Sequence, residues 1–451
     1  MALMVSVSGI RGVFGPDLHP QNIHRYAAAF GQWAKGGTVV VGRDSRVTGA
    51  LCEKVVEAAL MSVGCKVVRL GIVPTPTVAM AVLKHNAAGG IILSASHNPA
   101  EWNALKMLDG NSEFLDAAEG KKVIDIAQNE AFNYVGYDKI GTILQDDAAL
   151  RYHVDHILEL PFIDAGKIRK AGFRVAVDAV NGAGSESIPY LLERLGVEQV
   201  DKLHCTPDGL FPHNPEPLPA HLEEICAFVK DSDADLGVAV DPDADRLAFV
   251  DNEGRFFGEE YTQAAAFDFY LDHHKGDVCT NLSSSMICDF IAEKHGVRCH
   301  RSAVGEVNVV QKMRAEGAVI AGEGNGGVIL PALHAGRDAL VGIALMLQLM
   351  ADRNISAAEY RNSLPDYFIV KHKIQLDGID ADSVLAGLAA HYQNERQDDT
   401  DGIKIYFDEA GGWAHMRKSN TEPIIRIYTE STTHEKGEAL ADEIKKVVAG
   451  L

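Results

Sequence analysis

The sequence predicts an α/β protein with three similar α/β domains and a smaller C-terminal α+β domain. Short, branched apolar runs that end in polar or glycine-rich turns alternate with segments of helical spacing, which is typical of strand, helix and strand units. The chain of 451 residues is long enough for three or four domains of about 100–200 residues. We place the domains where the texture of the sequence changes, at residues 1–150, 151–257, 258–366 and 367–451.

Composition limits the class of protein. Hydrophobic residues make up 47% of the chain and charged residues 23%, which is ordinary for a soluble globular protein. A formal charge of −21 argues against a nucleic-acid partner, because phosphate backbones require a basic surface. No apolar run approaches the roughly 18 residues of a membrane span and no signal peptide is visible, so we expect a cytoplasmic protein without a membrane partner. The seven cysteines are scattered without CxxC spacing, and we interpret them as free thiols in a reducing compartment.

The first domain begins with an arginine between two glycines and continues with alternating helices and strands. From this position Arg11 can reach a phosphate or a carboxylate, or it can lie on an early turn. Helical spacing over residues 24–35 precedes a buried strand at 38–41. Arg43 and Arg46 follow this strand at its carboxyl end, which is the edge at which open α/β sheets bind ligands.

The most distinctive loop of the first domain is Ser94-Ala95-Ser96-His97-Asn98-Pro99. It follows an apolar strand, and the Asn-Pro pair forces a turn, so we expect the hydroxyl groups of Ser94 and Ser96 to be exposed at the strand end, where a serine can act as a nucleophile. The alternative is a turn in which the polar side chains only satisfy backbone groups. Lys106, ten residues beyond Ser96, is either a proton shuttle or phosphate clamp, or a solvated surface lysine.

The second domain contains an acidic run, Asp241-Pro242-Asp243-Ala244-Asp245-Arg246, directly after the apolar strand at residues 236–240. Three carboxylates in so short a run repel one another unless a hard cation holds them together. Mg²⁺ suits three oxygen ligands and keeps a position free for a phosphate oxygen. The run lacks the glycine and the glutamate that an EF-hand loop requires. A metal-free acidic turn is the alternative interpretation.

The last two domains each contain one loop that is suited to a sugar phosphate. In the third domain, four glycines surround Glu323 and Asn325, so that a carboxylate and an amide can project toward sugar hydroxyls. A plain glycine-rich hairpin is the alternative. In the fourth domain, the run from Arg417 to Thr421 and the nearby Arg426 provide charged and neutral donors for one anion. The alternative there is an ordinary surface loop.

In this order, these segments resemble the α-D-phosphohexomutase family, which includes phosphoglucomutases, phosphomannomutases and phosphoglucosamine mutases. The resemblance covers essentially the whole chain. It is carried by the early Gly-Ile-Arg-Gly, the Ala-Ser-His-Asn-Pro loop, the Asp-Pro-Asp-Ala-Asp-Arg loop, the Gly-Glu loop and the Arg-x-Ser-x-Thr-Glu-Pro loop. The resemblance implies mixed sheets in the α/β domains and a central cleft at which the four loops meet.

The resemblance also implies a mechanism. Ser96 carries a phosphoryl group that passes to a hexose phosphate, and the resulting hexose 1,6-bisphosphate turns around and returns its other phosphate to Ser96. The implied cofactors are Mg²⁺ and hexose 1,6-bisphosphate, and Arg11 and Lys106 match positions of the general acid and base. The implied site residues are catalytic (Ser96, Arg11, Lys106, His97, Arg246), metal-binding (Ser96, Asp241, Asp243, Asp245) and substrate-binding (Glu323, Asn325, Arg417, Ser419, Asn420, Thr421, Arg426).

The chain departs from many relatives in the sugar loop, where Asn325 and Gly327 stand in place of a serine and a histidine. This variant resembles the phosphoglucosamine mutase branch, so we expect a glucosamine phosphate as substrate, with glucose or mannose phosphate as the alternative. We expect a monomer or a homodimer. Two rival functions share these motifs: a metal-dependent phosphatase that passes the phosphate to water, and a catalytically silent sugar-phosphate sensor.

Overall fold

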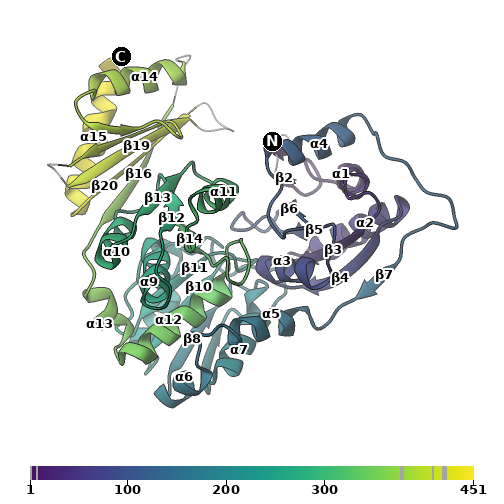
Figure 1. Cartoon of the computed structure of the whole chain (residues 1–451), viewed down its shortest axis with the longest axis horizontal. Helices are drawn as coiled ribbons and strands as arrows, with labels where there is room; N and C mark the ends of the chain where they lie inside the picture. Colours follow the sequence, from purple (N-terminus) through teal and green to yellow (C-terminus); the bar gives the residue numbers. More distant parts are fainter. Residues whose placement is uncertain (1–2, 7–8, 376–379, 409–410, 419–423, 451) are drawn as a thin grey trace. The chain divides into compact units, whose positions relative to one another are not determined.

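The computed structural model describes residues 3–6, 9–375, 380–408, 411–418 and 424–450. The chain forms two compact units, and Figure 1 colours both along the sequence. The first unit comprises residues 1–273 and 325–361, and the second comprises residues 274–324 and 362–451.

The N-terminal sheet of the first unit has seven strands in the order β1-β2-β6-β5-β3-β4-β7. The sheet is mixed, because β3, β4 and β5 run parallel whereas β6 is antiparallel to both β5 and β2. Its strands are β1 (Met4–Ser6), β2 (Gly9–Val13), β3 (Thr38–Arg43), β4 (Lys66–Ile72), β5 (Gly89–Leu93), β6 (Trp102–Asp109) and β7 (Ile143–Gln145).

Helices cover both faces of this sheet because its central strands are apolar on both sides. Val39 and Val41 of β3 pack into one buried cluster with side chains of α1, α2 and α4, whereas Val40 packs into another with side chains of α3. This alternation follows from the two-residue period of a strand. The helices are α1 (Pro20–Trp33), α2 (Gly49–Ser62), α3 (Thr75–Lys84), α4 (Ala117–Gln128) and α5 (Ala149–Leu158).

The second sheet of the first unit has the order β11-β10-β8-β9. Strand β10 is parallel to β8 and antiparallel to β11, and it is buried along its whole length. Helices α9 and α12 pack against each other, and α9 also contacts β11. The remaining elements of this unit are β8 (Arg174–Asp178), β9 (Gln199–Leu203), β10 (Leu236–Val240), β11 (Leu247–Asp251), β15 (Gly327–Ile329), α6 (Ala165–Ala171), α7 (Gly184–Leu195), a 3₁₀ helix (Pro219–His221), α8 (Glu223–Asp231), α9 (Glu259–His273), α12 (Ala339–Arg353) and α13 (Ala357–Asn362).

The second unit begins with parallel strands and ends with an antiparallel sheet. Strand β12 lies between β13 and β14 and is parallel to both, and α11 packs against all three. The C-terminal sheet has the order β16-β20-β19-β18-β17, and α14 and α15 pack on it (Figure 1). The elements are β12 (Val278–Asn281), α10 (Ile287–His295), β13 (Cys299–Ser302), α11 (Glu306–Glu316), β14 (Ile320–Glu323), β16 (Phe368–Gln375), α14 (Ala381–His391), β17 (Arg396–Asp398), β18 (Ile403–Phe407), β19 (Gly412–Lys418), β20 (Ile424–Ser431) and α15 (His434–Gly450).

The predicted fold class is confirmed, since α/β regions are followed by a smaller α+β region at the C-terminus. The domain boundaries and the meeting of the four loops in a cleft stay predictions. One central strand, β6, is not predicted by the sequence pattern, because Asn103 and Lys106 interrupt its apolar run even though both are buried. Within the described ranges, no helix has the length and apolarity that crossing a lipid bilayer requires.

Candidate active site

Ser96 lies in the loop that joins β5 to β6, and its backbone is strained. Its φ angle is +50°, in the left-handed region that few residues other than glycine adopt. The backbone N–H of Ser96 donates to Ser94 Oγ over 2.9 Å, so Ser94 shapes the loop. Strain of this kind costs on the order of 1–3 kcal/mol and persists only where the surroundings enforce it.

Arg46 enforces the conformation of the serine loop, which corrects the expectation that it binds a ligand. Its guanidinium group donates to the carbonyl oxygens of Ser96 (2.6 Å) and Asn98 (2.7 Å). Arg46 is 1% exposed, so these donors are not available to a ligand. Arg43, the other arginine at this edge, pairs with Glu53 at 3.4 Å.

The hydroxyl group of Ser96 faces the metal loop, which we define as residues 241–246. Ser96 Oγ donates to Asp241 Oδ2 over 2.7 Å. Ser96 is only 3% exposed, so the prediction of an exposed hydroxyl is wrong. The physical reason is that a carboxylate of the metal loop covers the end of β5. The contact brings together two segments that lie 145 residues apart in the chain.

His97 lies beside this serine as a neutral side chain. Its Nδ1 is 3.3 Å from Ser96 Oγ. Burial, together with the positive charges of Arg246 and Arg11, lowers the pKa of His97 to about 2. The imidazole can therefore exchange a hydrogen bond with the serine, but it brings no positive charge to a phosphoryl group.

The three aspartates of the metal loop form a compact set of oxygen donors. One ligand oxygen from each lies within 4.8 Å of the others, and all three residues are buried. Asp241 Oδ1 accepts from the backbone N–H groups of Asp245 (3.2 Å) and Arg246 (3.1 Å), so the loop folds around its first carboxylate. Asp243 Oδ1 and Asp245 Oδ1 are buried and accept no hydrogen bond from the described residues. Buried carboxylate oxygens without partners are costly, and a hard cation such as Mg²⁺ fits them.

The other oxygen of Asp243 has two donors. Lys106 Nζ and Thr75 Oγ1 each donate to Asp243 Oδ2 over 2.6 Å. Burial alone would raise the pKa of Asp243, but the Lys106 ammonium and the Thr75 hydroxyl hold it below its usual range. For Asp241, in contrast, burial and the negative charges of Asp245 and Asp243 raise the pKa. A bound divalent cation would favour the charged form of Asp241.

Lys106 is buried on β6, which excludes its interpretation as a solvated lysine. It pairs with Ile92 of β5 in the sheet and is 7% exposed. Burial disfavours the ammonium, but the negative charges of Asp243 and Asp245 outweigh it and raise the pKa of Lys106. The side chain is therefore a fixed positive charge beside the metal loop, and its part in proton transfer stays a prediction.

Two arginines lie at the serine loop and the metal loop, and the second of them, Arg246, is the last residue of the metal loop. Arg11 lies on β2 and donates through Nη1 to Asn98 Oδ1 over 2.8 Å, and burial lowers its pKa. Arg246 donates through Nη1 to Glu216 Oε1 over 3.1 Å. The Nε of Arg246 is buried and has no hydrogen-bond partner within the part of the chain that the structure describes. A buried N–H group without a partner favours an anionic acceptor beside it.

Two further residues of this site, Thr75 and Arg337, are not predicted from the sequence. Thr75 begins α3 and contacts Asp243, and Arg337 Nη2 donates to Asp245 Oδ2 over 2.8 Å. Thr75 is the first residue of α3, and Arg337 stands just before Asp338, which caps α12. Their partners lie 168 and 92 residues away in the chain, so no short sequence pattern reports the contacts.

The predicted sugar loop is divided between the two units. In the second unit, Glu323 ends β14, is 3% exposed and accepts through Oε1 from Asn281 Nδ2 over 3.1 Å. In the first unit, Asn325 Oδ1 accepts from the backbone N–H of Gly327 over 3.2 Å. Both side chains therefore have protein partners, and their contact with sugar hydroxyls stays a prediction.

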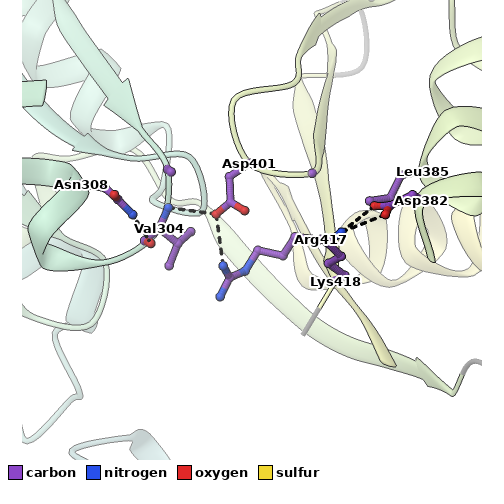
Figure 2. A pocket seen from close by; sticks show the side chains of 9 residues that line it. Val304, Asn308, Asp382, Leu385, Asp401, Arg417 and Lys418 are labelled. Carbon is purple, nitrogen blue, oxygen red and sulfur yellow. Dashed lines mark hydrogen bonds and ion pairs between the residues drawn. The ribbon is translucent and has the colours of Figure 1, made fainter. Parts of the chain in front are cut away.

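A cavity of about 400 Å³ lies beside the end of β19 in the second unit. Arg417 and Lys418 line it together with Asn308 and Asp401 (Figure 2). Asp401 Oδ2 accepts from Arg417 Nη1 (3.1 Å) and from the backbone N–H of Val304 (3.0 Å). Arg417 Nε is buried and has no hydrogen-bond partner among the described residues, so part of the guanidinium group remains available to an anion.

Arg417 also faces a second arginine. In the antiparallel pairing of β19 with β20, Arg417 lies directly opposite Arg426. Like charges in directly opposite positions destabilise a sheet, so this pair favours an anion between or beside the two groups. The other predicted members of this loop, Ser419, Asn420 and Thr421, lie outside the described residues.

Four family models match the chain in order. They are phosphoglucomutase/phosphomannomutase α/β/α domains I, II and III and the C-terminal domain of the same family, at residues 3–134, 151–254, 258–368 and 375–447. The chain therefore belongs to the phosphoglucomutase/phosphomannomutase family, the α-D-phosphohexomutases. The resemblance seen in the sequence is confirmed.

Relatives and solved structures match the chain over nearly its whole length. It is 36% identical to a phosphoglucomutase/phosphomannomutase of Thermococcus kodakarensis over 97% of this chain and 96% of that protein. It is 32% identical to a phosphoglucosamine/phosphogalactosamine mutase of Sulfurisphaera tokodaii over 100% of both. A phosphoglucomutase/phosphomannomutase family protein from Burkholderia thailandensis shares the fold with a TM-score of 0.86 at 24% identity, over 99% and 98% of the two chains. An Aspergillus fumigatus N-acetylphosphoglucosamine mutase in complex with GlcNAc-6P and magnesium has a TM-score of 0.60 at 14% identity, over 99% and 96%.

Proposed function

We propose that the protein is an isomerase that interconverts hexose 6-phosphate and hexose 1-phosphate through a phosphorylated Ser96. The observation that carries the proposal is the 2.7 Å contact between Ser96 Oγ and Asp241 Oδ2. Beside it lie two buried carboxylate oxygens that accept no hydrogen bond from the described residues. A serine in contact with an oxygen-donor set for Mg²⁺ is what a phosphoryl carrier requires.

Asp241, Asp243 and Asp245 would hold Mg²⁺, with Ser96 or its phosphate as a further ligand. When bound, the ion offsets negative charge on the phosphoryl group that is being transferred. The aspartates fit this ion because two of their oxygens are buried without a hydrogen-bond partner among the described residues, and a third accepts from the serine. The Nε of Arg246 has no hydrogen-bond partner in the described ranges, so Arg246 would donate to a phosphoryl oxygen in addition to the ion.

The transfer itself exchanges one phosphorus–oxygen bond for another. The bond from Ser96 Oγ to phosphorus breaks while a hydroxyl oxygen of the hexose phosphate bonds to phosphorus. The hydroxyl proton passes to a base, the leaving serine oxygen takes a proton from an acid, and the roles reverse in the return step. We propose Arg11 and Lys106 for this pair of groups, because they lie beside the serine loop and the metal loop.

The phosphate that is not being transferred needs a separate binding site, for which we propose Arg417 and Arg426. Their opposed positions on β19 and β20 leave two positive charges to share one anion. The Nε of Arg417, which has no hydrogen-bond partner in the part of the chain that is described, adds a directed donor. Because such a site contacts the phosphate and not the sugar ring, it can bind a hexose bisphosphate in both orientations.

We propose a glucosamine phosphate as the preferred substrate, with glucose or mannose phosphate as the alternative. The glycine-rich variant of the sugar loop, with Glu323 and Asn325, supports the first choice. The Sulfurisphaera tokodaii relative is named for phosphoglucosamine, which agrees with it, and the Thermococcus kodakarensis relative is named for the alternative. Glu323 suits an ammonium group, although a carboxylate binds hydroxyl groups equally well.

A substrate panel tests this function. Glucose, mannose, glucosamine and N-acetylglucosamine 6-phosphates are each incubated with the enzyme, Mg²⁺ and a trace of hexose 1,6-bisphosphate, and the 1-phosphate is quantified. We expect the fastest turnover with glucosamine 6-phosphate. Release of inorganic phosphate without isomerisation would identify a phosphatase, and binding without any turnover would identify a sensor.

A further inference from the structure

We propose that Arg337 positions Asp245 for the metal ion and that this role requires glycine at position 327. Arg337 lies between β15 and α12, and its Nη2 donates to Asp245 Oδ2 over 2.8 Å. The two side chains are 10% and 0% exposed, so the ion pair is buried. This role rests on the proposed function, because it makes the arginine a part of the Mg²⁺ site of the mutase.

Asp243 and Asp245 are held in a similar way. Each has one oxygen that accepts from a cation and one buried oxygen that accepts no hydrogen bond within the described ranges. Lys106 holds Asp243 at 2.6 Å, and Arg337 holds Asp245 at 2.8 Å. Thr75 also donates to Asp243, and Lys106 Nζ also lies 3.5 Å from Asp245 Oδ2. A carboxylate that is fixed through one oxygen has its other oxygen aimed in one direction. Partners outside the ligand set commonly orient metal ligands in this manner.

The placement of Arg337 depends on the absence of a side chain at position 327. A β-carbon added to Gly327 would overlap Cδ of Arg337 and would lie 2.8 Å from its Cγ. The backbone of Gly327 does not itself require glycine, because this residue lies in β15 with a φ angle outside the left-handed region. The arginine side chain therefore explains why glycine stands at this position.

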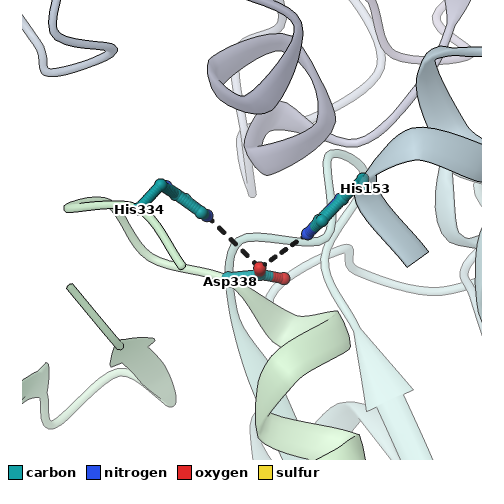
Figure 3. Close-up of side chains that lie close together, drawn as sticks. All are labelled: His153, His334 and Asp338. Carbon is teal, nitrogen blue, oxygen red and sulfur yellow. Dashed lines mark hydrogen bonds and ion pairs between the residues drawn. The ribbon is translucent and has the colours of Figure 1, made fainter. Parts of the chain in front are cut away.

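A buried hydrogen-bond network fixes the residue that follows Arg337. Asp338 Oδ2 accepts from His153 Nε2 (2.9 Å) and from His334 Nε2 (3.2 Å), as Figure 3 shows. The other carboxylate oxygen of Asp338 accepts from the first backbone N–H groups of α12 and caps the helix. All three side chains of the network are buried. The backbone next to Arg337 is therefore fixed by the two histidines and by the start of α12.

The start of α3 supports two of the three carboxylates of the metal loop. Thr75 donates to Asp243, and Thr77 Oγ1 lies 3.0 Å from His153 Nδ1. His153 in turn contacts Asp338, the neighbour of the arginine. One helix end thus fixes Asp243 directly and Asp245 through the buried network, which gives the two ligands a common support.

Charge compensation and positioning have opposite consequences for Mg²⁺ binding. If Arg337 only neutralised Asp245, its removal would leave more negative charge at the site, and Mg²⁺ would bind more tightly. If Arg337 orients Asp245, its removal lets the carboxylate rotate, and Mg²⁺ binds more weakly. Losing an orienting partner of a metal ligand typically costs about tenfold to hundredfold in affinity.

The test compares Mg²⁺ dissociation constants, measured by calorimetry on metal-free, dephosphorylated protein. Gly327→Ala and Arg337→Ala should each raise the dissociation constant by about tenfold to hundredfold. Arg337→Lys should raise it less, because lysine keeps a charged donor. In the double variant Gly327→Ala/Arg337→Ala, the glycine change should add nothing, because the methyl group enters space that the arginine has left.

Gly342→Ala is the matched control. Its added β-carbon would lie 2.7 Å from Cδ2 of Leu247, and its other near neighbour is Val328, so it adds the same methyl group to the packed region without disturbing Arg337. It should leave the dissociation constant unchanged. If Arg337→Ala does not fold, as circular dichroism would show, Gly327→Ala against Gly342→Ala decides the matter. Unchanged or tighter binding in Gly327→Ala, or additive effects in the double variant, would overturn the proposal.

The measurement uses no sugar, so it separates this role from the proposed function. If the wild-type protein lacks mutase turnover but shows the expected order of Mg²⁺ affinities, the proposed function fails and the positioning role of Arg337 stands. If turnover is present and the order of affinities is absent, the positioning role fails alone. In active variants kcat should fall while KM for the hexose phosphate stays constant, because Arg337 acts through Asp245. A change in KM alone would contradict the assignment.

Discussion

The two regions of the molecule that we propose to bind phosphate carry opposite electrostatic imbalances. The metal loop of the first unit gathers three buried carboxylates, of which two are held by Lys106 and Arg337 at 2.6 and 2.8 Å. The C-terminal sheet places Arg417 opposite Arg426, with a longer contact of 3.1 Å from Arg417 to Asp401. The first region therefore favours a cation in one geometry, and the second favours an anion in a looser site.

This difference separates the region proposed for phosphoryl transfer from the region proposed to bind the phosphate that is not transferred. A site of short, buried contacts is preorganised, so that its charges need not rearrange when a phosphoryl group is transferred. A site of longer contacts at a strand end can accept a phosphate from a substrate in more than one orientation. Changes in the first region should therefore affect the transfer step and stability, and changes in the second should affect binding.

The largest effect should follow from loss of the phosphoryl carrier. Ser96→Ala should abolish phosphate loading and lower turnover by at least about a thousandfold, because no other group would receive the phosphoryl group. Intact mass and turnover measure this. Ser94→Ala is the control, because Ser94 Oγ contacts the backbone N–H of Ser96 and the side chain of Asp44 rather than the aspartates of the metal loop, so this variant should still load phosphate. Wild-type turnover in Ser96→Ala would make another residue the carrier.

A smaller effect on stability should follow from breaking the buried ion pair of the metal loop. Lys106→Met leaves Asp243 buried without its cation, and this should lower the free energy of unfolding by about 3–5 kcal/mol. Lys121→Met removes an ion pair with Asp125 whose side chains are 71% and 51% exposed, and it should cost less than about 1 kcal/mol. Urea unfolding followed by circular dichroism compares the two. Equal losses would mean that Lys106 is not part of a tightly held site.

The second region should show its own dependence on pH. Burial lowers the pKa of His415 to about 4, and the ring contacts Ser283 Oγ (2.9 Å) and the carbonyl oxygen of Asp401 (2.7 Å). Between pH 4 and the ordinary value of about 6.5, the unfolded chain binds a proton that the folded chain does not. This contribution to stability is therefore complete above pH 6.5 and declines as the pH falls, by about 3 kcal/mol at pH 4.

Unfolding by urea at pH 7 and at pH 4.5 tests this contribution. His415→Gln has no group that titrates here, so its stability should fall less between the two pH values than that of the wild-type protein. The same fall in both proteins would show that other groups govern the acid sensitivity of this region.

The smallest effect should come from the arginine pair of the C-terminal sheet. Arg417→Ala removes a charge-assisted contact worth roughly 1.5–3 kcal/mol, so KM should rise about tenfold to hundredfold. The phosphorylation of Ser96 should persist, and the bisphosphate intermediate should escape more often, which would raise the need for added hexose bisphosphate. Arg396→Ala is the control, because Arg396 pairs with Asp408 at another edge of the same sheet, with side chains 57% and 67% exposed. Unchanged KM and bisphosphate release in Arg417→Ala would reduce this loop to a surface turn.

The two regions also differ in how far the sequence predicts them. The metal loop and the serine loop are short runs whose residue types indicate phosphoryl transfer with a metal ion. Asp243 and Ser96 can therefore be identified from the sequence without knowledge of the fold. The burial of Ser96, the strand that carries Lys106 and the contact of Arg337 with Asp245 are not found in this way. Each depends on pairing between distant segments, such as the 92 residues that separate Arg337 from its partner.

The same reasoning explains the misinterpretation of Arg46. Arg46 follows β3 at the edge where open α/β sheets bind ligands. Nothing in the neighbouring residues shows that its N–H groups donate to a loop that comes later in the chain. The structure brings the carbonyl oxygens of Ser96 and Asn98 to its guanidinium group. The local sequence thus predicts which side chains could bind a ligand. Contacts between distant segments decide which of these side chains already have partners in the protein.

One measurement tests the central claim, that Ser96 exchanges a phosphoryl group with a sugar phosphate. The purified protein is loaded with hexose 1,6-bisphosphate carrying a labelled phosphate, and peptide mapping locates the label. Unlabelled glucosamine 6-phosphate and Mg²⁺ are then added in a single turnover. We expect one label per chain on Ser96 and its transfer to glucosamine 1,6-bisphosphate. Label on another residue, or its release as inorganic phosphate, would contradict the account.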